Sequence, residues 1–178
     1  VHSKYLDKIV LSTEDAEIKT VAKAIGYEVV DRPAKLATDT AMNEDVLRHA
    51  LKVEKDDYDM VVLLQPTSPL RLPEDIDKCI ELAVQDGKGC VSYNGSHKNG
   101  AVYVCYKSFL VNGNNFDQPF EKFYNMPADR SLDIDYHGHF MEKYGLPSEV
   151  KFCTRCVISN QRPSSAVEYE HTINSQKE

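Results

Sequence analysis

Gln65–Arg71 is the first stretch of the sequence whose side chains could bind a small polar ligand. It reads Gln-Pro-Thr-Ser-Pro-Leu-Arg and directly follows the apolar run Met60–Leu64. In open α/β sheets, ligands bind beyond the carboxyl ends of the strands, and an amide, two hydroxyls and a guanidinium are suitable groups for a sugar or a nucleotide. The two prolines stiffen the loop. An ordinary strand-to-helix turn, whose hydroxyls cap the next helix, is the alternative interpretation.

Asp133 and Asp135 flank Ile134 in a segment, Ser131–Asp135, that we predict to be a strand. Because side chains alternate along a strand, both carboxylates would face one side and Ile134 would face the core. Two carboxylates so close repel one another, and a divalent cation relieves that repulsion. Hard oxygen ligands together with substrate phosphates suit Mg²⁺. The pair is therefore a candidate magnesium site, and an exposed strand end with two solvated acids is the alternative.

Arg32 lies in another polar segment, between Asp31 and Pro33 and ahead of a predicted helix that includes Asp45–Leu51. A guanidinium there could bind an anion or the carbonyl of a base. The alternative is a surface ion pair with Asp31 or Asp39, which contributes little to stability.

Short β-rich runs alternate with helical patterns along most of the chain, which indicates an α/β protein with a largely parallel sheet. Met60–Leu64 is apolar throughout, as a central strand covered on both faces should be. Thr13 can cap the first helix and Gly26 can end it. The predicted strands are Lys8–Ser12, Tyr27–Val30, Met60–Leu64, Gly89–Tyr93, Ala101–Tyr106 and Ser131–Asp135, and the predicted helices cover Glu14–Ile25, Asp45–Leu51 and Glu74–Gln85.

The overall composition excludes several classes of protein. The chain has 178 residues, of which 42% are hydrophobic and 28% charged, and this composition is typical of a soluble globular protein. A net charge of −7 argues against a nucleic-acid binder, and no apolar run approaches the roughly 20 residues that span a bilayer. Five cysteines, an odd number, indicate reduced thiols and a cytoplasmic protein.

Five segments taken together resemble the acylneuraminate cytidylyltransferases, the family of CMP-sialic, legionaminic and pseudaminic acid synthetases. They are Lys8–Thr13, Arg32–Ala41, Leu64–Arg71, Asn99–Tyr103 and Ser131–Asp135. The resemblance implies a three-layer, Rossmann-like nucleotide-diphospho-sugar transferase sheet, incomplete at the N-terminus. It also implies transfer of CMP from CTP to the anomeric hydroxyl of a nine-carbon keto-sugar acid, with release of pyrophosphate.

The resemblance assigns roles to eight residues of this sequence. On the catalytic and nucleotide side, Asp133 and Asp135 are expected to bind Mg²⁺, Gln65 to lie between nucleotide and sugar, and Arg32 and Asn43 to bind CTP. On the sugar side, the expected residues are Asn99, Tyr103 and Phe116.

Three departures from the family pattern accompany the resemblance, one of which is the replacement of a further family aspartate near His139. The family opens with a strand and a glycine-rich loop that grips the triphosphate, and this sequence begins where the family's next segment lies. The family is homodimeric through an insertion, and only Asn94–Lys98 stands at that place here, with an Asn-Gly pair typical of a tight turn.

From about Pro147 the amphipathic pattern fades, so we predict a cytidylyltransferase-like domain over 1–146 and a weakly structured tail over 147–178. Lys151–Pro163 resembles the start of an N-acetyl sugar amidotransferase, and Cys153 with Cys156 could form half of a zinc site. Two alternative functions remain. The departures from the family pattern allow a catalytically inactive sugar- or nucleotide-binding remnant of the family, and the cysteine pair of the tail allows a small zinc-binding or interaction module.

Overall fold

The computed structural model describes residues 3–134. By its internal contacts the chain divides into two units, Val1–Leu132 and Asp133–Glu178. The predicted domain boundary after residue 146 lies outside the described residues, as do Asp135 and the cysteine pair of the tail. The boundary therefore stays a prediction.

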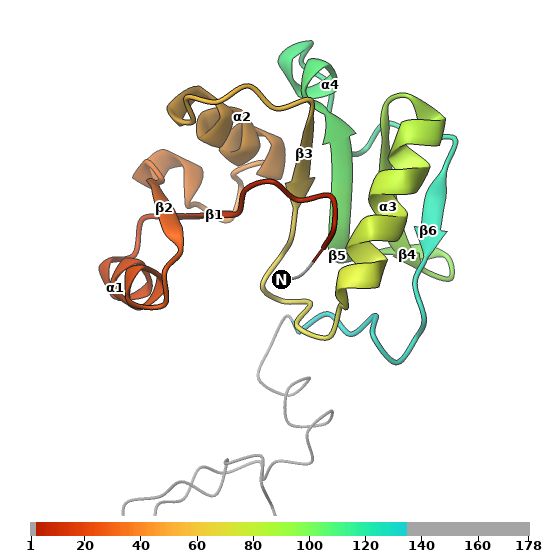
Figure 1. Cartoon of the computed structure of the whole chain (residues 1–178), viewed down its shortest axis with the longest axis horizontal. Helices are drawn as coiled ribbons and strands as arrows, with labels where there is room; N and C mark the ends of the chain where they lie inside the picture. The colour runs from red at the N-terminus through yellow and green to blue at the C-terminus, as the bar shows by residue number, and fades with distance from the viewer. Residues whose placement is uncertain (1–2, 135–178) are drawn as a thin grey trace, which may run out of the picture. The chain divides into compact units, whose positions relative to one another are not determined.

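The first unit holds a four-stranded and a two-stranded sheet (Figure 1). The larger sheet has the order β3 (Met60–Leu63), β5 (His97–Tyr106), β4 (Gly89–Asn94) and β6 (Phe123–Asn125). The smaller sheet pairs β1 (Val10–Thr13) with β2 (Glu28–Asp31) in parallel. The predicted α/β class is confirmed.

The four-stranded sheet is mixed rather than largely parallel, so that prediction was wrong for it. β5 runs antiparallel to both β3 and β4, whereas β6 runs parallel to β4. The cause is local, because only Gly95 and Ser96 separate β4 from β5, and a connection of two residues can join only antiparallel strands. Gly95 has a φ of +64°, as the Asn-Gly pair predicts for a tight turn.

Helices cover both faces of the larger sheet, which makes three layers. Side chains alternate along β5, so Val102 and Val104 pack with α3 (Pro73–Asp86). Cys105, on the opposite face, packs with α2 (Asn43–Val53) and α4 (Lys107–Val111). β3 lies at the edge of this sheet with all four residues half-buried, so its predicted central position was wrong.

The helix α1 (Ala16–Ala24) packs on the smaller sheet and begins at a different residue from the one predicted. The carboxylate of Asp15 accepts the N–H of Ile18 at 2.8 Å and so caps the helix. Thr13 instead accepts the N–H of Asp15, at 3.2 Å. Gly26 ends the helix with a φ of +88°, as expected.

The end of the described chain differs most from the prediction. Residues 131–134 form no strand, whereas β6 was not predicted. Pro127 opens a turn, in which its carbonyl accepts the N–H of Arg130 at 3.1 Å, and this turn separates Ser131 from the sheet. The period-of-two argument for Asp133 therefore does not apply. Among the helices within residues 3–134, none is long and apolar enough to cross a membrane.

Candidate functional site

Gln65–Arg71 leaves the carboxyl end of β3, and Arg71 holds its shape. Nη1 of Arg71 donates to the carbonyls of Gln65 at 2.7 Å, Ser68 at 2.9 Å and Ala101 at 3.1 Å. The hydroxyl of Ser68, which is fully buried, donates to the carbonyl of Asn99 at 3.3 Å. Burial lowers the pKa of the Arg71 guanidinium. The loop is therefore tied to the start of β5 by a cation that faces inward.

The side-chain amide of Gln65 makes no hydrogen bond within residues 3–134, and the residue is half-buried. Gln65 lies two residues after Leu63, which pairs with Tyr103 across the β3–β5 ladder. This amide can both donate and accept, so it is available to a ligand.

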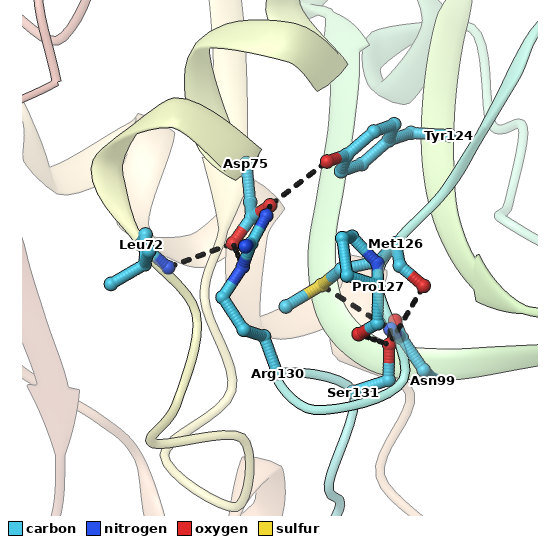
Figure 2. A network of polar contacts seen from close by, with 8 residues as sticks. All are labelled: Leu72, Asp75, Asn99, Tyr124, Met126, Pro127, Arg130 and Ser131. Atoms are coloured by element: carbon cyan, nitrogen blue, oxygen red, sulfur yellow. Dashed lines mark hydrogen bonds and ion pairs between the residues drawn. The ribbon is translucent and has the colours of Figure 1, made fainter.

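Asn99 sits in a bulge of β5, where the β4–β5 register shifts and Gly100 has a φ of +72°. A bulge re-aims a side chain, and here it turns the amide of Asn99 into the interior. Its Oδ1 accepts the hydroxyl of Ser92 at 2.5 Å and the N–H of Ala101 at 3.2 Å. Its Nδ2 donates to Ser131 Oγ at 3.1 Å and faces Met126 Sδ at 3.4 Å, as Figure 2 shows.

The amide of Asn99 is therefore occupied within the protein, because an asparagine has two amide protons and two carbonyl lone pairs. Only 4% of the residue is exposed. It braces the start of β5 against Ser131, and its predicted contact with a sugar stays a prediction.

Tyr103 and Phe116, both predicted for the sugar side, are in contact. Their ring centroids lie 5.0 Å apart and their planes are tilted by 58°. Phe116 is held by two residues that the motif comparison did not single out. Glu44, next to Asn43 in the first turn of α2, accepts the N–H of Phe116 at 2.7 Å. Lys98 donates to its carbonyl at 2.5 Å.

A second network, also absent from the sequence predictions, centres on Asp75 in the first turn of α3. This fully buried carboxylate accepts two hydrogen bonds from Arg130, at 3.0 and 2.7 Å, and one from Tyr124 at 2.9 Å (Figure 2). Burial by itself would raise the pKa of Asp75, but the hydrogen bonds from Arg130, from the Leu72 N–H and from Tyr124 outweigh it and lower the pKa. In the sequence, the Pro-Glu-Asp start of this helix indicates that Asp75 can cap the helix, but nothing there indicates its pairing with Arg130.

Arg32 and Asn43, the predicted CTP residues, lie apart from this network. Arg32 forms an ion pair with Glu14, at 2.8 Å from Nε and 2.6 Å from Nη2, rather than with Asp31 or Asp39. The hydrogen bond from Arg32 lowers the pKa of Glu14. Asn43 is exposed at the first residue of α2. Within residues 3–134, no hydrogen bond or ion pair joins either residue to Gln65.

Asp133 belongs to the second unit and Asp135 lies outside the described residues. Oδ1 of Asp133 is buried and has no hydrogen-bond partner in the part of the chain that the structure describes. Over that same part, no group of three or more acidic, histidine or cysteine side chains could hold a metal. The predicted magnesium pair therefore stays a prediction.

A hollow of about 520 Å³ lies at the other end of β5, around Tyr106, Phe109 and Asn112. It is far along the strand from Asn99, and none of the predicted site residues lines it. We therefore base the candidate site on Gln65, Tyr103 and Phe116 rather than on this hollow.

Comparisons with known proteins agree with the motifs. Residues 1–108 match a family model described as cytidylyltransferase. N-acylneuraminate cytidylyltransferase of Escherichia coli O18:K1:H7 is 26% identical over 171 residues, covering 76% of this chain and 41% of that protein. CMP-N,N'-diacetyllegionaminic acid synthase of Legionella pneumophila is 38% identical over 96 residues, covering 52% of this chain and 41% of that protein. Post-translational flagellin modification protein B of Campylobacter coli is 27% identical over 174 residues, covering 75% of this chain and 74% of that protein. The chain thus spans 41% of the length of the first two relatives.

Proposed function

The chain belongs to the cytidylyltransferase family, and from this we propose that it transfers CMP from CTP to a nonulosonic, sialic-type acid. The products are the CMP-sugar and pyrophosphate. The observation that carries the proposal is the amide of Gln65, which makes no hydrogen bond within residues 3–134 and follows by two residues Leu63, the ladder partner of Tyr103 in the Tyr103–Phe116 pair. Two of the similar proteins are named for sialic-type acids, which supports that substrate class.

In the proposed reaction the anomeric hydroxyl of the acid attacks the α-phosphorus of CTP and loses its proton to solvent. The bond between the α-phosphorus and the oxygen that bridges it to the β-phosphorus breaks, and pyrophosphate leaves with the electrons of that bond. Positioning accounts for most of the catalysis in such transfers. Gln65 orients the two substrates, since its amide can donate to one and accept from the other. On the sugar side, the half-buried ring of Tyr103 contacts the sugar and its N-acyl group, and Phe116, which is 4% exposed, supports Tyr103 from the interior. Asn99 acts by bracing β5, because its amide is already occupied.

Arg32 and Asn43 bind CTP in this proposal. The guanidinium of Arg32 is half-buried and paired with Glu14, so CTP must compete with that carboxylate. A partly exposed ion pair of this kind is weak, and a triphosphate with higher charge can displace it.

Asp133 and Asp135 are the proposed Mg²⁺ ligands. The donor set fits, because carboxylate oxygens are hard ligands and the buried Oδ1 of Asp133 has no partner within the described residues. When bound, Mg²⁺ would offset the charge that develops on the phosphate oxygens.

Pyrophosphate release tests the proposal. The full chain is incubated with CTP, Mg²⁺ and N-acetylneuraminate, beside the variants Gln65→Leu and, as a matched control, Gln85→Leu, at an exposed residue in the last turn of α3. We expect release that depends on both substrates, is lowered at least about tenfold by Gln65→Leu and is unchanged in the control. Sugar binding without any release would instead support the inactive remnant, and neither binding nor release would refute the proposed function.

A further inference from the structure

Phe116 is held through its backbone by two side chains of opposite charge from two different elements. Glu44, in α2, accepts its N–H at 2.7 Å. Lys98, in β5, donates to its carbonyl at 2.5 Å. We call Glu44 and Lys98 the Phe116 clamp.

The buried carboxylate is the unusual member of the clamp. Glu44 is 4% exposed, although an ionised carboxylate is costly to bury unless it is well paired. A glutamate in the first turn of a helix is favoured by the helix dipole, but an exposed side chain would serve that purpose equally well. Glu74, which occupies the first turn of α3, is exposed in that way. The burial of Glu44 is therefore connected with the segment that it holds.

The clamp determines where an aromatic ring lies. Phe116 is 4% exposed and contacts Tyr103, with 5.0 Å between ring centroids, and Phe120, with 6.4 Å. Tyr103 comes from β5 and is only half-buried. Because Phe116 lies in a loop between α4 and β6, its backbone contacts to Glu44 and Lys98 fix the ring relative to Tyr103.

We propose that Glu44 and Lys98 are positioning residues. They fix the relative position of the Phe116 and Tyr103 rings, which we call the aromatic wall, and thereby determine the affinity for the sugar acid. Neither residue touches the reacting atoms. The identity of the ligand rests on the proposed function, whereas the clamp itself stands on the hydrogen bonds to Phe116. The experiments below separate these two parts.

A fluorescence measurement tests the clamp without any substrate. The sequence contains no tryptophan, so Phe116→Trp introduces a single reporter. Into this background we add Glu44→Ala, Glu44→Gln, which keeps the accepting oxygen, and Lys98→Met. Glu74→Ala is the matched control. In Glu44→Ala and Lys98→Met we expect the fraction of molecules in which the segment around residue 116 is released to rise about fivefold, the factor in the equilibrium constant for one lost hydrogen bond, and acrylamide quenching to rise with that fraction. Glu44→Gln and Glu74→Ala should remain near the parent.

Circular dichroism accompanies each variant. If Glu44→Ala does not fold, the Lys98→Met variant tests the clamp by itself. The side chain of Lys98 is 31% exposed, so replacing it leaves no buried cavity. Unchanged quenching in a folded Glu44→Ala or Lys98→Met protein would overturn the clamp, whether or not the chain turns over.

Ligand experiments then test the sugar side. N-acetylneuraminate should change the emission of the tryptophan introduced by Phe116→Trp. In the otherwise unchanged chain, Glu44→Ala should raise the KM for that acid about fivefold while kcat and the KM for CTP change little. Glu44→Gln should restore the KM. If quenching confirms the clamp but N-acetylneuraminate changes neither the emission nor, through Glu44→Ala, its own KM, the assignment of the aromatic wall to the sugar is overturned. An equal effect on the KM for CTP would overturn the specific positioning role.

Discussion

Replacing Asp75 with asparagine removes the centre of the network that joins the start of α3 to the segment after β6. The carboxylate of Asp75 accepts hydrogen bonds from Leu72 N at 2.8 Å, Tyr124 Oη at 2.9 Å, Arg130 Nε at 3.0 Å and Arg130 Nη2 at 2.7 Å. Its exposed fraction is 0%. Asparagine has nearly the same size, but its NH₂ group would face donors where an oxygen now accepts, and the guanidinium would lose its counter-charge.

The magnitude follows from these contacts. Removing one partner of a fully buried ion pair destabilises a protein by about 3–5 kcal/mol, and because the side chain of Arg130 is 25% exposed, we expect the lower end, about 3 kcal/mol, for Asp75→Asn. Tyr124→Phe removes a single hydrogen bond to the charged acceptor and leaves the others, so we expect about 1.5 kcal/mol for it. For a domain of this size, a loss of about 3 kcal/mol in the free energy of unfolding corresponds to a fall in Tm of roughly 10 °C.

Urea unfolding at neutral pH, followed by far-ultraviolet circular dichroism, measures both changes. The free energy of unfolding should fall modestly in Tyr124→Phe and further in Asp75→Asn, with little change in the dependence on urea concentration. Asp129→Asn, an exposed residue of the neighbouring turn, controls for the loss of one negative charge. If Asp75→Asn destabilises the protein no more than Tyr124→Phe or the control does, the reasoning about a buried, paired carboxylate is refuted.

Three further predictions use simpler measurements. Because the folded pKa of Asp75 is lowered, its stabilisation is present above the unfolded value of about 4 and is lost as pH falls through the lowered folded value; the stability difference between the parent and Asp75→Asn should therefore shrink in acidic urea titrations, and a constant difference would contradict the pairing. Burial raises the pKa of the Cys105 thiol to about 12, so iodoacetamide at about pH 8 should label it only after urea unfolding, as mass spectrometry of peptides can establish. A Cβ on Gly89 would lie 2.5 Å from the carbonyl oxygen of Val104, so Gly89→Ala should destabilise the fold by about 1–3 kcal/mol in urea unfolding, and a neutral result would mean that the strands can separate there.

The elements that the sequence predicted are those with a strong local pattern. The helix over Glu74–Gln85 appears as Pro73–Asp86, and the strand Gly89–Tyr93 appears as Gly89–Asn94. β6 escaped prediction because three residues are too few to show a period of two. The predicted strand Ser131–Asp135 failed over its described residues because a turn, not an alternating pattern, governs the backbone after Pro127.

The candidate site likewise has features that the sequence predicted and features that it did not. The Gln65–Arg71 motif was readable because its residues are contiguous, and its position after β3 follows from the strand that precedes it. The roles of Arg71 and Asn99 were not readable. Both carry polar groups that suit a ligand, yet the structure uses Arg71 to hold its own loop and Asn99 to brace a bulge.

By itself, the sequence determined the alternation of helices and strands, the tight turn at Gly95 and the membership of the cytidylyltransferase family, since each depends on residues close together in the chain or on a motif in order. Only the tertiary structure decided that Glu44 holds Phe116, 72 residues away, and that Asp75 meets Arg130 across 55 residues. The physical reason is that a buried charge finds its partner through the packing of whole elements, which no local pattern encodes.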